Sequence, residues 1–349
     1  MDTTFRLRRM AILATIAVTL ATAGCGGSYA SEARTRQPHS AVVGTRHRTG
    51  PLDVTFLVQS DTHFGADLQA PWRGPPLAGA GRLEMLDLQR YIADQANAIQ
   101  GQSWPAAFGG EVGKPVGMLL AGDLTEDGDP QQWKQFVSVY GGPNRPALLK
   151  MAVEESVGNH DNRSGPYVAG EVTRRHGGVE YSVDWGDLHV VSLGEEPAEG
   201  TVEWLRDDLK GLGADMPIVI FFHRPILGPY SGTGWFGVAA NQEAFYGAIR
   251  EHQVIAIFHG HIHKTGNYTW HGIPVYLPGS AKNEARSFLV AHITDDRLQV
   301  ASWNYELGDF WWWEQRPLGG SKDVKAIVGQ QAFGDRKPHV PYPVQAQAL

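Results

Sequence analysis

Histidine, aspartate and asparagine recur at five places in the 349-residue chain, each shortly after a mostly apolar run. Imidazole nitrogens and carboxylate or amide oxygens suit Mn, Fe and Zn. A carboxylate can also bridge two ions, and ions about 3.5–4 Å apart can hold both the attacking and the leaving oxygen of a phosphoryl group. The residues are Asp61, His63, Asp123, Asn159, His160, His223, His261 and His263. Their types are those that a two-metal hydrolytic site would need.

The elements that must position these side chains follow from the apolar pattern. Short runs at 54–58, 116–121, 150–153, 217–222 and 254–258 predict strands buried on both faces. Helical patterns lie between them at 83–99, 202–212 and 241–249. The alternation predicts an α/β fold, with a hairpin-rich section at 181–192 and after residue 273. Because ligand sites in such sheets lie beyond the carboxyl ends of strands, we expect the eight side chains at one rim.

The order of these residues resembles the calcineurin-like metallophosphoesterase superfamily, whose pattern is D-x-H, G-D, G-N-H-[DE], H and G-H-x-H. The matching segments are Asp61-Thr62-His63, Gly122-Asp123, Gly158-Asn159-His160-Asp161, His223 and Gly260-His261-Ile262-His263. The resemblance implies a four-layer α/β/β/α sandwich of two mixed β-sheets with a di-metal site at their shared rim. We expect the catalytic domain at 52–316 and a C-terminal extension at 317–349.

The same resemblance implies a role for each residue. Asp61, His63 and His263 would hold one metal, Asn159, His223 and His261 the other, and Asp123 would bridge them. A hydroxide held by the two metals would attack phosphorus. His160 would act at a leaving or non-bridging oxygen, as an acid or as a transition-state stabiliser, and Asp161 would orient it by accepting its ring N–H. The cofactors would be two divalent or trivalent ions, with Mn, Fe and Zn as alternatives.

One difference from a related pattern narrows the choice of branch within the superfamily. Purple acid phosphatases place a tyrosine three residues after the bridging aspartate, and Glu126 stands there in this chain. The run Gly122-Asp-Leu-Thr-Glu-Asp-Gly128 is more similar to the class III cyclic-nucleotide phosphodiesterase branch. We therefore favour a phosphodiester substrate. The alternatives are a phosphomonoesterase or nucleotidase, and a non-catalytic metal-binding surface lipoprotein.

Substrate choice is expected to depend on loops. The glycine-rich loop at 228–240 carries Tyr230, Trp235 and Phe236. Such aromatic side chains can stack on a base or contact lipid. They can equally pack over a sheet edge, so both interpretations stay open.

The first 25 residues are typical of an export signal. Arg6, Arg8 and Arg9 precede an apolar stretch from Met10 to Ala21, which is too short for an ordinary membrane span. Thr22-Ala-Gly-Cys25 then ends in the only cysteine and resembles a bacterial lipoprotein cleavage site, although Thr22 replaces the expected leucine. We predict a lipidated Cys25 that attaches the protein to a membrane at its periplasmic or extracellular face, with ordinary secretion as the alternative.

Composition limits the remaining possibilities. Residues 26–50 are rich in Gly, Ser, Arg and Thr and predict a flexible linker. The net charge is −7, and no basic stripe follows the leader, so we expect no nucleic-acid-binding patch. No later apolar run reaches 18 residues, which predicts no further membrane span. The expected partner is a small phosphoester, and the sequence leaves the oligomeric state open.

Overall fold

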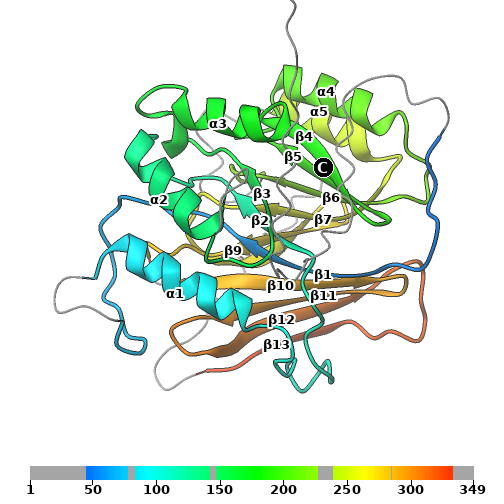
Figure 1. Cartoon of the computed structure of the whole chain (residues 1–349). Helices are drawn as coiled ribbons and strands as arrows, with labels where there is room; N and C mark the ends of the chain where they lie inside the picture. The colour runs from blue at the N-terminus through cyan, green and yellow to red at the C-terminus, as the bar shows by residue number, and fades with distance from the viewer. Residues whose placement is uncertain (1–44, 78–82, 142–146, 227–238, 284, 333–349) are drawn as a thin grey trace, which may run out of the picture. The chain divides into compact units, whose positions relative to one another are not determined.

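The computed structural model describes residues 45–77, 83–141, 147–226, 239–283 and 285–332 (Figure 1). All of these belong to one contact unit, Arg34–Leu349. Cys25 and the rest of the predicted signal segment lie outside the described residues, as do Tyr230, Trp235 and Phe236.

A seven-stranded mixed sheet carries the first part of the candidate site. Its strand order is β13-β12-β11-β10-β1-β2-β3, in which β1, β2 and β3 run parallel and the other pairs are antiparallel. The strands are β1 (Asp53–Gln59), β2 (Gly117–Ala121), β3 (Ala152–Ser156), β10 (Ser287–Thr294), β11 (Arg297–Asn304), β12 (Asp309–Pro317) and β13 (Ile327–Gln330).

A six-stranded mixed sheet carries the rest. Its order is β4-β5-β6-β7-β9-β8, with β5, β6, β7 and β9 parallel and an antiparallel strand at each edge. The strands are β4 (Glu180–Trp185), β5 (Leu188–Leu193), β6 (Pro217–Phe222), β7 (Gln253–His259), β8 (Thr265–Trp270) and β9 (Ile273–Pro278).

In the described part of the chain, five α-helices cover the outer faces of the two sheets. They are α1 (Met85–Asn97), α2 (Pro130–Tyr140), α3 (Tyr167–His176), α4 (Glu199–Leu209) and α5 (Ala239–Ile249), and a 3-10 turn, η1, spans His160–Asn162. The start of helix α2 is fixed by an N-terminal capping residue and a proline. Asp129 accepts hydrogen bonds from the backbone N–H groups of Gln131 and Gln132, and Pro130 occupies the first turn.

The continuous apolar runs are explained by strands with both faces buried. In β1, Phe56 and Val58 face the core between the two sheets, whereas Leu57 faces the core under the helices. In β6, Phe221 faces the inter-sheet core and Ile220 faces the core under α4 and α5. A strand that alternates between two cores has no polar face to interrupt its apolar run.

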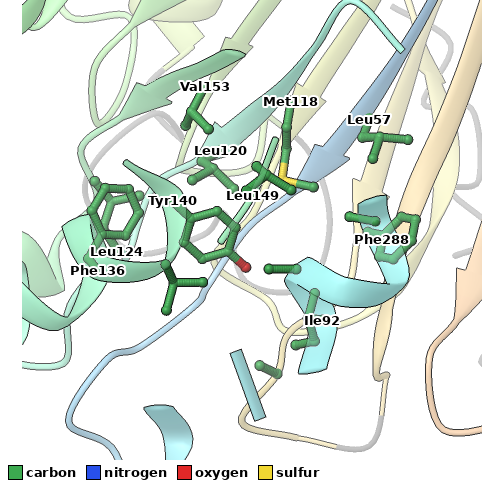
Figure 2. Packing of buried hydrophobic residues seen from close by; sticks show 14 of the residues in the cluster. Leu57, Ile92, Met118, Leu120, Leu124, Phe136, Tyr140, Leu149, Val153 and Phe288 are labelled. Carbon is green, nitrogen blue, oxygen red and sulfur yellow. The ribbon is translucent and has the colours of Figure 1, made fainter. Parts of the chain in front are cut away.

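Three cores therefore separate four layers, which confirms the predicted α/β/β/α sandwich. Side chains of α1, α2 and α3 pack on the seven-stranded sheet, and those of α4 and α5 pack on the six-stranded sheet. Figure 2 shows the first of these cores. It labels Leu57, Met118, Leu120, Val153 and Phe288 from strands, Ile92, Phe136 and Tyr140 from helices, and Leu124 and Leu149 from loops.

The seven-stranded sheet continues past residue 316, where the catalytic domain was expected to end. Strand β13 lies in the predicted extension and pairs with β12, Trp312 opposite Gln330. Its four residues alternate between half-buried and exposed, which is too weak a pattern to identify a short edge strand from sequence. Within the described residues, no helix is both long and apolar enough to span a membrane.

The end of the predicted linker is also held on the domain. The backbone N–H of Arg46 donates to Gly211 O at 2.8 Å, and its guanidinium pairs with Asp184. Thr49 and Gly50 donate backbone N–H groups to Asp187. Residues 46–50 are therefore attached to the fold, a difference from the predicted flexible segment that arises because their partners are far away in sequence.

Candidate metal centre

The predicted site residues follow the carboxyl ends of five strands from both sheets, and the expectation of a common rim is confirmed. They follow β1, β2 and β3 of one sheet and β6 and β7 of the other. Backbone hydrogen bonds join neighbouring loops, from Asp61 N to Gly122 O at 2.9 Å and from Gly260 N to His223 O at 3.0 Å. Four of the residues remain partly exposed, so the rim is open to solvent at Asn159, His160, His261 and His263.

The first group of metal-ligating atoms comes from Asp61, His63, Asp123 and His263. One side-chain atom of each lies within 4.8 Å of the others. His263 Nε2 is 3.0 Å from His63 Nε2 and 3.2 Å from Asp61 Oδ1. His63 Nε2 is 3.8 Å from Asp123 Oδ2.

The second group comes from Asp123, His223 and His261, joined by Asn159. His261 Nδ1 is 2.9 Å from Asn159 Oδ1 and 3.2 Å from His223 Nε2. His223 Nε2 is 3.2 Å from Asp123 Oδ2. Asp123 belongs to both groups, which is the position a bridging carboxylate requires. The structure thus brings all seven predicted ligands together in the two predicted sets, and their ligation of metal stays a prediction.

The chemistry of the donors fits metal ions. His63 Nδ1 lies 2.8 Å from Glu126 Oε2, His223 Nδ1 lies 2.9 Å from Ala121 O, and His263 Nδ1 contacts Asn283 Oδ1. These acceptors can hold the Nδ1–H of each ring, which would leave the converging Nε2 atom of the neutral imidazole to ligate a metal ion. Ligand atoms about 2.1 Å from a shared ion can be at most about 4.2 Å apart, and the separations quoted above satisfy this limit.

Neighbouring charges keep the two buried carboxylates ionised, as metal ligation requires. Burial opposes ionisation of Asp61, but the neighbouring His263 lowers the pKa of Asp61 to about 2. Burial opposes ionisation of Asp123 as well, and His223 brings the pKa of Asp123 far below its usual value. Both groups are therefore ionised at neutral pH.

The ligand loops adopt an unusual backbone. Asp61, His63, Asp123, His261 and His263 all have φ between 46° and 73°, and His271 is the only other non-glycine residue with positive φ in the described chain. This left-handed conformation costs about 1–2 kcal/mol for each L-residue. His261 and His263 therefore depart from the extended backbone in which side chains two positions apart point the same way.

Two motif glycines make room for the carboxylates. A Cβ on Gly260 would lie 2.5 Å from Asp61 Oδ2, and a Cβ on Gly158 would overlap Asp123 Oδ1. The carboxylate oxygens occupy the space that any other side chain would need. The two glycines therefore belong to the site although they carry no functional group.

His160 begins the 3-10 turn after β3 and lies beside the bridging carboxylate. Its backbone N–H donates to Asp123 Oδ1 at 2.8 Å, and its Nε2 is 3.9 Å from Asp123 Oδ2. Its Nδ1 is 2.7 Å from Glu126 O, and its Nε2 is 2.7 Å from a guanidinium nitrogen of Arg163. Burial lowers the pKa of His160, although Asp123 opposes this, so the ring is neutral at pH 7.

The predicted role of Asp161 as the acceptor for the His160 ring is wrong. The buried Asp161 carboxylate accepts backbone N–H groups of Gly158 at 2.8 Å, Leu124 at 3.1 Å and Thr125 at 2.8 Å, and the Thr125 hydroxyl at 2.7 Å. Consecutive residues of a 3-10 turn point about 120° apart, so Asp161 turns inward while His160 faces the rim. Asp161 instead ties the loop after β2 to the loop after β3.

Several supporting residues escaped the sequence analysis. Glu126 was noted only as a substitute for tyrosine, yet it contacts His63 and pairs with Lys282 Nζ at 2.8 Å. Lys282 and Asn283 follow β9 and carry no local signal of a role at a rim that begins more than 200 residues earlier.

The sequence analysis also missed Gln89 on α1, although the sequence did contain a signal for it. It is fully buried, and its Nε2 donates to Thr62 O at 2.8 Å, between two predicted ligands. The Tyr140 hydroxyl donates to Gln89 Oε1 at 2.6 Å. A glutamine on the apolar face of an amphipathic helix needs a buried partner, and that need could have marked it.

Comparison with known proteins defines the class. The calcineurin-like phosphoesterase model matches residues 54–265, more than half of the chain. The chain belongs to this family and is a metal-dependent phosphoesterase.

Individual relatives are more distant. A probable cyclic nucleotide phosphodiesterase of Rhodopseudomonas palustris is 25% identical over 254 residues, covering 68% of this chain and 82% of that protein. A second, from Rhodococcus erythropolis, is 26% identical over 178 residues, covering 48% of this chain and 58% of its own length. The solved structure of GAP50, the anchor in the inner membrane complex of Plasmodium, covers 78% of this chain and 91% of its own, with 10% identity and a TM-score of 0.50, and shows the fold alone.

Replacing Gln89 by leucine tests whether α1 positions the first ligand loop. We expect metal affinity to fall about tenfold, because Thr62 O loses the donor that fixes the backbone between Asp61 and His63. Calorimetric metal titration of folded protein measures the change. Leu88→Ala on the same helix is the control, since it removes buried side-chain atoms from the core without touching Thr62. Equal metal affinity in the wild type and Gln89→Leu would contradict this role.

Proposed function

We propose that this protein hydrolyses a phosphodiester, using two metal ions held by the seven converging ligands. The observation that carries the proposal is the sharing of Asp123 between two groups of ligand atoms with the His160 ring beside it. Two relatives named as probable cyclic nucleotide phosphodiesterases support a diester, as does the run from Gly122 to Gly128. Both relatives are near 25% identity, and the proposal therefore names the phosphodiester class and not a particular diester.

The positions of the ligand residues suggest which of the two ions each would hold. Asp61, His63 and His263 would hold one ion, Asn159, His223 and His261 the other, with Asp123 common to both. When bound, the ions would supply positive charge for the phosphoryl oxygens and lower the pKa of coordinated water. The ligand set suits Mn, Fe and Zn.

The chain's own acid–base group in this proposal is His160. Its neutral ring has an acceptor for Nδ1–H in Glu126 O, which leaves the lone pair at Nε2. Nε2 lies on the open side of the site within 4 Å of the bridging carboxylate. Nε2 is therefore placed to exchange a proton with a phosphoryl or leaving-group oxygen. The backbone N–H of His160 donates to Asp123 and holds the residue beside that carboxylate.

A substrate panel tests the reaction. Metal-loaded protein should cleave bis-p-nitrophenyl phosphate in preference to p-nitrophenyl phosphate. His160→Ala should lower kcat by about 10²–10⁴ while the metal content stays the same, because a positioned proton-transfer group contributes that much. A tenfold or greater preference for the monoester would replace the diester proposal by a phosphomonoesterase or nucleotidase. Unchanged turnover in His160→Ala would remove His160 from the mechanism.

We also propose that the enzyme acts outside the cytoplasm, anchored through a lipidated Cys25. The support is the leader sequence, together with the place where the chain joins the domain. Arg46 binds beside Gly211 in the loop that precedes β6, whereas His223 follows the other end of β6. The point where the described chain joins the domain and the predicted ligand His223 thus lie at opposite ends of β6.

Cys25→Ser tests the anchor. In a bacterial host that lipidates exported proteins, the wild type should remain with the membrane fraction and incorporate radiolabelled palmitate. The variant should lose both properties while its folded domain stays intact, because no other cysteine is present. A wild type found in the soluble exported fraction without label would favour ordinary secretion and contradict the anchor.

A further inference from the structure

Arg163 is a cation at the edge of the metal centre to which nothing above assigns a role in the reaction. It follows the 3-10 turn that carries His160, and its side chain is 46% exposed. One guanidinium nitrogen lies 2.7 Å from His160 Nε2, and the other donates to Glu126 O at 3.3 Å. The guanidinium thus covers the ring atom that faces the bridging carboxylate.

The contact fixes the direction of the hydrogen bond. Arginine has donors only, so His160 Nε2 must accept from Arg163. His160 Nδ1 then carries the hydrogen and donates to Glu126 O at 2.7 Å. In the free protein, Arg163 and the Glu126 carbonyl together select one tautomer of the ring. An oxygen anion that approaches Nε2 also comes within reach of the guanidinium.

The surrounding charges make this cation important to an anionic substrate. The Arg163 guanidinium lies 3.6 Å from Glu126 Oε1 and 3.8 Å from Asp127 Oδ1. Lys282 Nζ lies 2.8 Å from both Glu126 oxygens, so it balances that carboxylate. Arg163 balances the remaining charge of Asp127. Without it, this side of the opening would carry excess negative charge and repel a phosphate ester.

We propose that Arg163 is a substrate-binding residue that donates to a phosphoryl oxygen beside His160 and, before substrate binds, holds the ring with its lone pair at Nε2. A guanidinium suits this task because its planar pair of N–H donors matches two oxygens of a phosphoryl group. The inference rests on the proposed phosphoester hydrolysis.

The first test measures phosphate recognition in metal-loaded protein. Arg163→Met should raise the inhibition constant of inorganic phosphate and the KM for bis-p-nitrophenyl phosphate by about 10- to 100-fold, because a charge-assisted hydrogen bond is lost. Arg163→Lys should recover part of the loss, since it keeps the charge without the paired donors. Arg174→Met is the matched control, because Arg174 is an exposed arginine that pairs with Glu171 and not with a site residue.

The second test needs no catalysis. Nitrogen-15 NMR of histidine-labelled, metal-free protein should show His160 protonated at Nδ1 in the wild type and a tautomer mixture in Arg163→Met. A purely structural arginine would leave phosphate affinity and tautomer unchanged, and that result would overturn the proposal. A wild type that cleaves no phosphoester would instead sink the proposed function, while phosphate binding and the tautomer would still report on Arg163.

Discussion

The Asp61 carboxylate joins the two sheets at the point where the metal ligands meet. It follows β1 of one sheet and accepts the backbone N–H of His261, which follows β7 of the other, at 3.0 and 3.1 Å. Asp123 makes the equivalent link between neighbouring loops by accepting the His160 N–H. The same two groups that would bind metal thus align the loops, so ligand geometry and sheet packing cannot vary independently.

This alignment has an energetic cost that the rest of the fold must offset. Five predicted ligands hold left-handed backbone, which costs about 1–2 kcal/mol for each L-residue. Three apolar cores and the four hydrogen bonds to Asp161 keep the loops in place. The strain is concentrated at the site, as expected where an arrangement is preorganised for a ligand.

The parts predictable from sequence were those with local signatures. Strands buried on both faces gave continuous apolar runs, and the ligands stood shortly after them, so the α/β class and the common rim followed. The four-layer architecture came from the family resemblance. The predicted role of Asp161 was wrong because the sequence motif does not reveal the 3-10 turn that points Asp161 away from the His160 ring. Glu126 and Asn283 support predicted ligands only through tertiary contacts, and no spacing rule reports those. Strand β13 was missed because a four-residue edge strand needs little apolar content.

The central claim is that Asp123 serves two ions at once, and metal stoichiometry tests it most directly. Elemental analysis of metal-saturated, desalted protein should find two ions in each chain. Asp123→Ala should retain one ion at most, because both groups lose a ligand. His271→Ala should retain two, since His271 has the same left-handed backbone but stacks on Tyr246 and belongs to neither group of ligand atoms. One ion in the saturated wild type, or two in Asp123→Ala, would contradict the account.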